Sequence, residues 1–126
     1  MDLNSFTETI LGAAYEVYNV LGYGFSEKVY ENALELELRS RGVSLGRQIT
    51  LVVKYKGRPV GTYKADMVVE RCVTVELKTG AAIHEEHFRQ CLNYLKASDL
   101  RLGLVLNFGP AGVDKRRVVN GDPVVR

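Results

Sequence analysis

Asp66, Glu76 and Lys78 have the side chains and the spacing to act on a phosphate group. Magnesium characteristically takes one or two carboxylates from a protein and completes its shell with water and substrate phosphate. Lys78 follows Glu76 by two positions, so on a strand the two side chains share a face and stand about 7 Å apart. Taken alone, the Glu-x-Lys spacing is weak evidence, because most such charges lie on solvent-exposed strands. A site requires that the fold bring Asp66 to Glu76.

A tight hairpin would bring the two acids together. The β-forming runs 60–69 and 73–79 are separated only by residues 70–72, so they must pair as an antiparallel hairpin. With a three-residue connection, Asp66 lies directly opposite Glu76. A two-residue turn would instead place Asp66 beside the apolar row of the opposite face, where a carboxylate is costly to bury. The three-residue register is therefore predicted, and a divalent cation would offset the repulsion between the opposed acids.

In this register the two faces of the hairpin differ in polarity. The face that carries both acids is mainly polar, and the other face is apolar. The first holds Asp66, Val68, Thr74, Glu76 and Lys78, and the second holds Ala65, Met67, Val69, Val73, Val75 and Leu77.

Hydrophobic periodicity assigns the elements that must hold this hairpin in place. Steps of three and four between apolar residues predict helices, and alternation or continuous apolar runs predict strands. The predicted order is helix 4–21, helix 26–41 with Ser26 as N-cap, strand 47–55, strand 60–69, strand 73–79, helix 84–97, strand 102–108 and edge strand 113–119. We expect the second helix to bury Val29, Ala33, Leu34, Leu36 and Leu38. This order predicts an α/β sandwich with one mixed sheet.

Length and composition limit the class of protein. The chain has 126 residues, 46% of them hydrophobic and 25% charged, which predicts one globular domain over 1–126 with loose termini at 1–3 and 121–126. Apolar runs are far shorter than the roughly 20 residues of a membrane span. The first residues lack both the basic opening and the apolar run of a secretory signal. We therefore expect a cytoplasmic, bacterial protein that does not bind membranes.

Zinc chemistry is not indicated. Cys72 and Cys91 stand 19 positions apart without a CxxC partner, so we expect two buried or half-buried thiols. His84 and His87 are three residues apart, whereas helical zinc-binding histidines are usually four apart. Both histidines are expected to be exposed on the first turn of a helix.

Charge is distributed unevenly along the chain. Residues 1–38 carry a net charge of −6, residues 39–71 carry +6, and the remainder carries +2. The basic middle third predicts phosphate contacts, and the residues assigned to nucleic-acid binding are Arg47, Lys54, Arg58 and Lys64. A solvated sheet face is an equally good interpretation of the same charges.

Two motifs resemble known nucleases. Asp66 followed by Glu76-Leu77-Lys78 resembles the PD-(D/E)xK nuclease superfamily, although Ala65 stands where the name has proline. Gly24-Phe25-Ser26-Glu27-Lys28-Val29-Tyr30 matches G-x-x-E-x-x-Y, the run after which the GxxExxY protein family is named. That family looks like a compact branch of the same superfamily. The resemblance continues through 30–34, 75–78, 90–96 and 102–109, and it covers about residues 5 to 120.

The resemblance implies a restriction-endonuclease-like αβββαβ core with a mixed sheet flanked by helices. It implies Asp66 and Glu76 as ligands of Mg2+ or Mn2+, Lys78 as the catalytic amine, and Glu27 as a further acid beside the metal. Gln90 is implied as a site residue carried by a helix. For Tyr30, a catalytic role and a packing role are left equally open.

The implied function is a small magnesium-dependent nuclease that hydrolyses DNA phosphodiester bonds, with RNA not excluded. So short a chain leaves little room for a specificity domain, so base-selective cutting needs a homodimer, a partner protein or a particular DNA structure. The alternative is a catalytically weak or inactive module that binds nucleic acid or protein. The complete set of Glu27, Asp66, Glu76 and Lys78 favours the enzyme.

Overall fold

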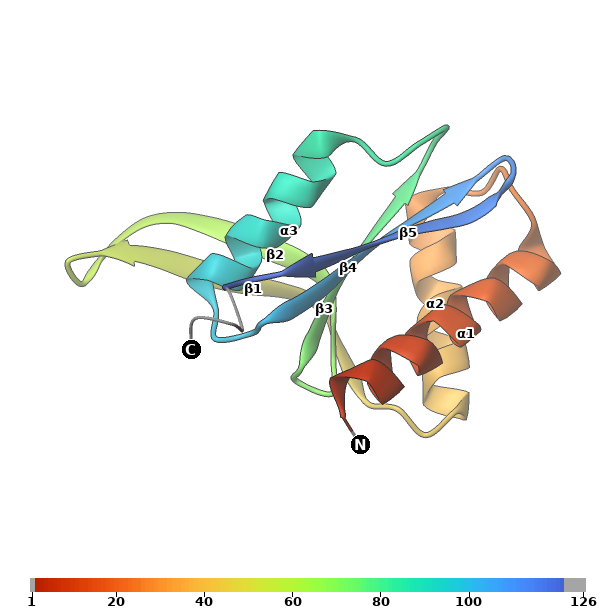
Figure 1. Cartoon of the computed structure of the whole chain (residues 1–126), viewed down its shortest axis with the longest axis horizontal. Helices are drawn as coiled ribbons and strands as arrows, with labels where there is room; N and C mark the ends of the chain where they lie inside the picture. Colours follow the sequence, from red (N-terminus) through yellow and green to blue (C-terminus); the bar gives the residue numbers. More distant parts are fainter. Residues whose placement is uncertain (1, 122–126) are drawn as a thin grey trace.

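The computed structural model describes residues 2–121. Three helices and five strands follow one another in the chain (Figure 1). Their bounds are α1 Leu3–Leu21, α2 Glu27–Ser40, β1 Leu45–Tyr55, β2 Arg58–Val69, β3 Val73–Thr79, α3 Glu85–Ala97, β4 Leu102–Gly109 and β5 Gly112–Val119. Every predicted element is confirmed, and most bounds agree within one or two residues.

One mixed sheet is the centre of the molecule. Its strand order is β1-β2-β3-β4-β5, and β3 and β4 are parallel while every other neighbouring pair is antiparallel. All eight residues of β4 are buried, as expected for a strand with helices on both faces. The predicted α/β architecture with a mixed sheet is therefore confirmed.

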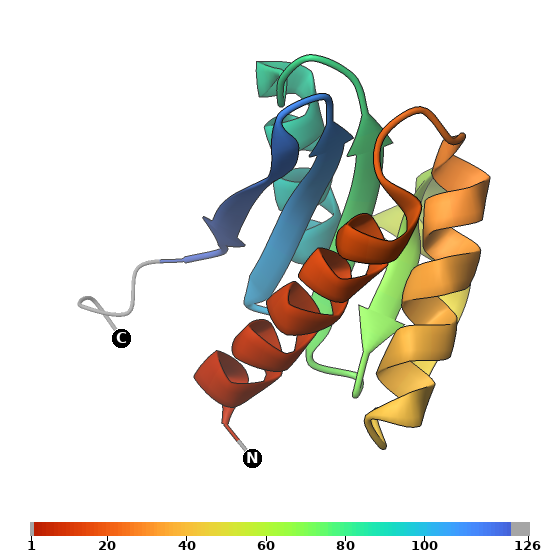
Figure 2. The same ribbon diagram turned by 90° about the vertical axis from the view of Figure 1, so that its right-hand side faces the viewer.

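The helices cover the two faces of the sheet unequally. Helices α1 and α2 pack on one face, where Ile10, Leu34 and Met67 belong to the larger apolar core (Figure 2). Helix α3 packs on the opposite face, where Cys91 and Val105 belong to a smaller apolar cluster. The face covered by α3 is the one on which the hairpin carries its acids, so only a short helix separates that face from solvent.

The turn between β2 and β3 sets the register of the hairpin. Val69 pairs with Val73, so three residues connect the strands as predicted. Within this turn, Glu70 and Arg71 adopt the left-handed conformation with φ of 51° and 56°. The Glu70 carboxylate accepts hydrogen bonds from the backbone N–H (2.7 Å) and the hydroxyl (3.0 Å) of Ser44. These bonds help to hold a backbone conformation that non-glycine residues adopt infrequently.

Local side chains fix the ends of the first two helices. The Asp2 carboxylate accepts a hydrogen bond from the Ser5 N–H (2.8 Å), and the Ser26 hydroxyl caps α2 as predicted. Leu3 is already helical, whereas the sequence led us to expect a loose end at 1–3. Of the predicted loose C-terminal end, only Gly121 falls within the described residues.

The buried stripe of α2 differs from the predicted one. Tyr30, Leu34 and Leu38 follow each other at steps of four and are fully buried, whereas Leu36 is 73% exposed. Because successive residues turn by about 100° around a helix, position 36 lies away from the stripe formed by 30, 34 and 38. Val29 is also exposed, so the prediction of a buried position is wrong for two of the five residues, Val29 and Leu36.

Strands β1 and β2 extend as a long hairpin beyond the helices (Figure 1). Its outer part is solvent-exposed on both strands, including Lys54, Arg58 and Lys64. Among residues 2–121, no helix is long and apolar enough to cross a membrane.

Gly103 on β4 allows α3 to approach the sheet closely. A Cβ atom at this position would stand 2.5 Å from the Cys91 Sγ atom and 2.9 Å from the Thr74 Cγ2 atom. We expect Gly103→Ala to lower the free energy of unfolding by about 1–3 kcal/mol, because the added methyl group overpacks this contact. Urea denaturation measures the effect, with Gly61→Ala as the control, since nothing lies within 4 Å of a Cβ built there. Adding Cys91→Ala should restore part of the loss, and no restoration would mean that the overpacking lies elsewhere.

Candidate active site

The hairpin brings Asp66 and Glu76 to neighbouring positions of adjacent strands. Met67 pairs with Val75, and the Oδ2 atom of Asp66, the residue before Met67, accepts a hydrogen bond from the Leu77 N–H (2.8 Å). The Asp66 carboxylate therefore reaches across to β3 at residues 76 and 77. The predicted hairpin register is confirmed.

The polar face is largely covered from solvent. Glu76 is only 6% exposed, and Thr74 is fully buried. Asp66 and Lys78 are half-buried. Tyr94, on α3, is itself buried and belongs to the helix that packs on this face. The two acids therefore lie in an environment from which much of the water has been excluded.

Electrostatics show which charged groups gather around Glu76. Burial raises the pKa of Glu76 to about 8, and the negative charge of Asp66 adds to this shift. Lys78 acts in the opposite direction on the pKa of Glu76, and the charge of Glu27 raises it further. Three predicted site residues, Glu27 from α2 and Asp66 and Lys78 from the hairpin, thus influence the buried carboxyl group of Glu76. At neutral pH the folded protein without metal favours a protonated Glu76.

The GxxExxY motif forms the entry to α2. Gly24 has a φ of +119°, a conformation that strains other residues, and Glu27 is the first residue of the helix. The buried Tyr30 ring stacks on Phe108, with ring centroids 4.4 Å apart. Its hydroxyl donates a hydrogen bond to the Gly22 carbonyl. The glycine and the tyrosine therefore shape the segment that presents Glu27.

Tyr30 serves packing in this structure. Its ring also lies edge-on to the Phe25 ring, with centroids 6.2 Å apart, as in a hydrophobic staple at the start of a helix. The side chain is fully buried, and its hydroxyl is engaged by the backbone. Of the two roles left open for Tyr30, the structure supports packing, and its inclusion among the catalytic residues is revised to a positioning role.

Gln90 lies on the exposed side of α3, four residues before the buried Tyr94. The structure gives its side chain no hydrogen bond to any described residue. Burial raises the pKa of Tyr94, and the charge of Glu76 contributes to that shift, so Tyr94 lies near this acid. Gln90 therefore remains a predicted site residue at the edge of the helix.

The sequence predicts phosphate contacts for Arg47, but its side chain is engaged within the protein. Its Nε atom contacts the Glu31 carboxylate at 2.6 Å, and its Nη1 atom contacts the Glu35 carboxylate at 3.0 Å. Both acids belong to α2, so Arg47 ties β1 to that helix and its charge is already neutralised. The assignment of Arg47 to nucleic-acid binding is corrected on this ground. Lys54, Arg58 and Lys64 are exposed on the projecting hairpin.

Two side chains near Lys78 were not predicted as site residues. Asn107 of β4 pairs with Lys78 in the parallel register, and its Oδ1 atom is buried without a hydrogen-bond partner among the described residues. Its Nδ2 atom donates to the Gly80 carbonyl (2.9 Å). His87 is partly buried, and burial followed by the charge of Lys78 lowers its pKa. A buried asparagine within an otherwise apolar strand is the signal that could have identified Asn107.

Asp66 and Glu76 fit a hard divalent cation. Within residues 2–121, no group of three or more His, Cys, Asp or Glu side chains is arranged to hold a metal ion. Two carboxylates are nevertheless the number that magnesium commonly takes from a protein. A cation would replace the proton that the crowded carboxyl groups otherwise retain. The donor chemistry therefore agrees with Mg2+ or Mn2+ and not with zinc, which prefers nitrogen and sulfur ligands.

Comparison with known proteins identifies the family and the fold. A sequence model of the PD-(D/E)XK nuclease superfamily matches residues 4–118. No curated protein matches the chain in sequence. The crystal structure of SSO0001 is similar in fold, with a TM-score of 0.61 and 14% identity over 79% of this chain and 52% of the other. The chain thus spans about half the length of SSO0001.

A second structural relative is an alkaline exonuclease, LHK-Exo, from Laribacter hongkongensis. Its crystal structure has a TM-score of 0.51 and 12% identity to this chain, and the match covers 89% of this chain and 78% of the exonuclease. At these identities the two structures establish the fold. The predicted restriction-endonuclease-like architecture is confirmed.

The raised pKa of Glu76 predicts a pH-dependent stability in the absence of metal. The folded state retains a proton up to about pH 8, whereas the unfolded chain releases it near the ordinary value of 4.5. This group therefore supports folding fully below about pH 4.5, and its contribution is lost progressively as the pH rises to about 8. We expect Glu76→Gln to become increasingly more stable than the parent across this interval.

Urea denaturation in EDTA between pH 5 and pH 8.5 measures this difference. The control is Glu16→Gln, which neutralises an exposed acid on α1. A difference between Glu76→Gln and the parent that stays constant with pH would show that Glu76 titrates normally.

Proposed function

Because this chain belongs to the PD-(D/E)XK nuclease superfamily, we propose that it is a magnesium-dependent nuclease that hydrolyses DNA phosphodiester bonds. The observation that carries the proposal is the pair Asp66 and Glu76, held side by side on a covered sheet face with Lys78 next to them. Two crowded carboxylates are unfavourable in a protein that has no cation to hold there. The two acids lower the stability of the metal-free protein, and a role in metal-assisted hydrolysis gives a reason for having them there.

Each side chain of the cluster has a distinct role in this proposal. Asp66 and Glu76 would hold Mg2+ or Mn2+, and such a cation would act as a Lewis acid on a phosphate oxygen and on bound water. Lys78 places a positive charge where negative charge develops on the phosphate in the transition state. Glu27 contributes a further carboxylate from the start of α2. Gln90 and Asn107 lie at the edges of the cluster and orient these groups or the substrate.

The projecting β1–β2 hairpin supports binding to DNA. Lys54, Arg58 and Lys64 are exposed there, and the structure gives none of them an ion pair with a described residue. Such charges make sequence-independent contacts to phosphates, which RNA shares. RNA is therefore the alternative substrate.

Within the superfamily, we assign the chain to the GxxExxY branch. The conformation of Gly24 and the hydrogen bond from Tyr30 to the Gly22 carbonyl explain why glycine and tyrosine flank the glutamate in that motif. We further propose that the chain acts as one domain in the bacterial cytoplasm. For base-selective cutting we propose a homodimer, a partner protein or a particular DNA structure.

The second candidate function is a catalytically inactive module that binds nucleic acid or protein. The projecting hairpin alone would support it, since exposed basic and apolar residues alternate there. The four residues Glu27, Asp66, Glu76 and Lys78 favour the enzyme, because binding alone does not require two acids to be crowded under a helix.

Metal binding is tested by thermal and urea unfolding in EDTA and in millimolar MgCl2 or MnCl2. A cation that binds only the folded protein stabilises it by about 2.7 kcal/mol at a hundredfold excess over Kd. We expect Asp66→Asn to lose most of this stabilisation, whereas Asp114→Asn, an exposed acid on β5, should keep it. Equal unfolding curves with and without metal for the parent would contradict the metal site.

Cleavage is tested with linear, circular, single-stranded and branched DNA and with RNA, in the presence of magnesium or manganese. We expect Lys78→Ala to lower the single-turnover rate by about 100-fold or more, because one group that stabilises transition-state charge is lost. Lys96→Ala, an exposed lysine on α3, should cut like the parent. If the parent binds nucleic acid but cuts none of these substrates, the binding module is the correct function.

A further inference from the structure

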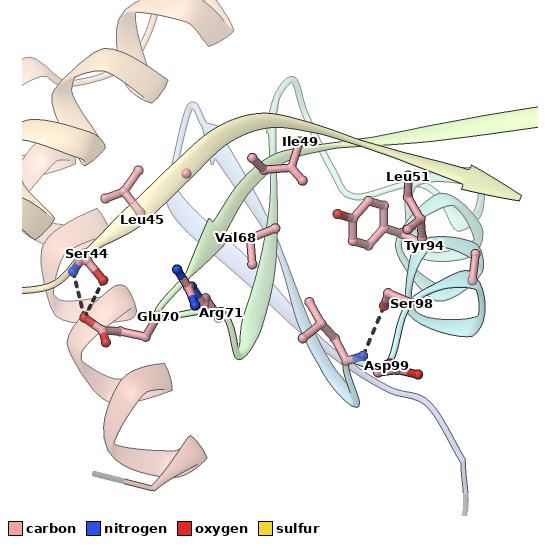
Figure 3. A pocket seen from close by; sticks show the side chains of 13 residues that line it. Ser44, Leu45, Ile49, Leu51, Val68, Glu70, Arg71, Tyr94, Ser98 and Asp99 are labelled. Atoms are coloured by element: carbon pink, nitrogen blue, oxygen red, sulfur yellow. Dashed lines mark hydrogen bonds between the residues drawn. The ribbon is translucent and has the colours of Figure 1, made fainter.

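A pocket of about 680 Å³ lies on the sheet face that carries the acids (Figure 3). It is bounded by the first half of β1, the end of β2 with the turn that follows, and the last turn of α3. Its size falls in the range of about 300–1,000 Å³ that is usual for small-molecule sites. None of the residues assigned to the reaction lines it.

The walls of this pocket suit a flat ring. Ile49 and Leu51 of β1 and Val68 of β2 form an aliphatic surface, and Tyr94 of α3 adds an aromatic ring. In Figure 3 the Tyr94 ring points from the helix toward the space between helix and strands. Aliphatic and aromatic side chains of this kind stack on unpaired nucleobases.

The pocket adjoins the acid cluster directly. Val68 follows Asp66 by two residues on the same strand, so their side chains share a face about 7 Å apart. Tyr94 joins the two regions, because it lines the pocket and also lies near enough to Glu76 for the charge of that acid to affect its pKa. If a nucleic-acid chain places one phosphate at Asp66 and Glu76, a neighbouring base of that chain is therefore within reach of the pocket.

The rim of the pocket offers one free donor and one free acceptor. Arg71 and Asp99 are exposed, and neither forms an ion pair or a side-chain hydrogen bond with another described residue. Ser44 and Glu70, also at the rim, already bond to each other. Nucleobase edges carry both donors and acceptors, so a base in the pocket can bond to either Arg71 or Asp99. A phosphate would instead be repelled by Asp99 and Glu70.

We propose that this pocket receives an unstacked nucleobase of the strand being cut, so that the substrate is single-stranded, frayed or flapped nucleic acid. The proposal rests on the proposed nuclease function, because that function places the phosphate at Asp66 and Glu76. A base inside an intact duplex would first have to leave its stack, which disfavours fully paired DNA.

The pocket can be filled without touching the acids. Ile49 lines the pocket and is 38% exposed on the edge strand, so Ile49→Trp adds an indole at its mouth. Val52 lies on the same strand, is 46% exposed and does not line the pocket, so Val52→Trp is the matched control. Circular dichroism and thermal unfolding establish that both variants are folded.

Binding is measured by fluorescence anisotropy with a single-stranded DNA oligonucleotide and a blunt duplex of the same sequence. All proteins carry Lys78→Ala, which keeps the strand intact in magnesium if that residue is catalytic. We expect the single strand to bind about tenfold more tightly than the duplex, the order of one base–aromatic stack. Ile49→Trp should abolish this preference, and Val52→Trp should retain it. One abasic position in the oligonucleotide should reproduce the effect of Ile49→Trp.

The outcomes separate this inference from the proposed function. Equal binding of single strand and duplex, or a preference that Ile49→Trp leaves unchanged, would overturn the pocket even if the parent cleaves DNA. A single-strand preference that Ile49→Trp removes supports the pocket, and it does so even if the parent cleaves nothing. In the latter case the nuclease function fails while the base-binding pocket remains.

Discussion

The register of the β2–β3 hairpin is the constraint on which the site depends. Its three-residue turn determines that Asp66 lies beside Glu76 and not among the apolar side chains that face α1 and α2. A slip of one residue would move every side chain of β2 to the other face. The left-handed turn residues and the bonds between Glu70 and Ser44 hold this register from outside the site. The stability of a turn outside the acid cluster is thus a condition for the geometry of the cluster.

The sheet face that carries the proposed site also has the smaller apolar cluster. On the opposite face, α1 and α2 bury a large apolar cluster, which supplies most of the hydrophobic stabilisation. Under α3 the apolar cluster is small, and one of the buried positions on this face is occupied by the acid Glu76. The fold tolerates the unfavourable carboxyl pair under α3 because most of its stability comes from the larger core under α1 and α2.

Much of the fold could be predicted from local pattern, because periodicity and turn length act within a few residues. The Ser26 cap, the strands and the pairing of Val69 with Val73 follow from such signals. The residues that were misjudged depend on distant partners: Arg47 is neutralised by Glu31 and Glu35 sixteen and twelve positions earlier. Likewise, only the packing of α3 shows that Glu76 is buried.

The contacts of α1 bear on how the chain folds as it is synthesised. Its Tyr18 hydroxyl donates to the Gly109 carbonyl (2.6 Å), and its Tyr15 hydroxyl accepts from the Lys115 ammonium (2.9 Å), residues 91 and 100 positions apart. The strands β4 and β5, which cover part of this first helix, therefore lie far downstream of it and are synthesised well after it. Before these strands are made, α1 can pack against α2 and β3, while the surface that faces β4 and β5 stays exposed. Docking of α1 onto β4 and β5 thus follows the synthesis of both strands.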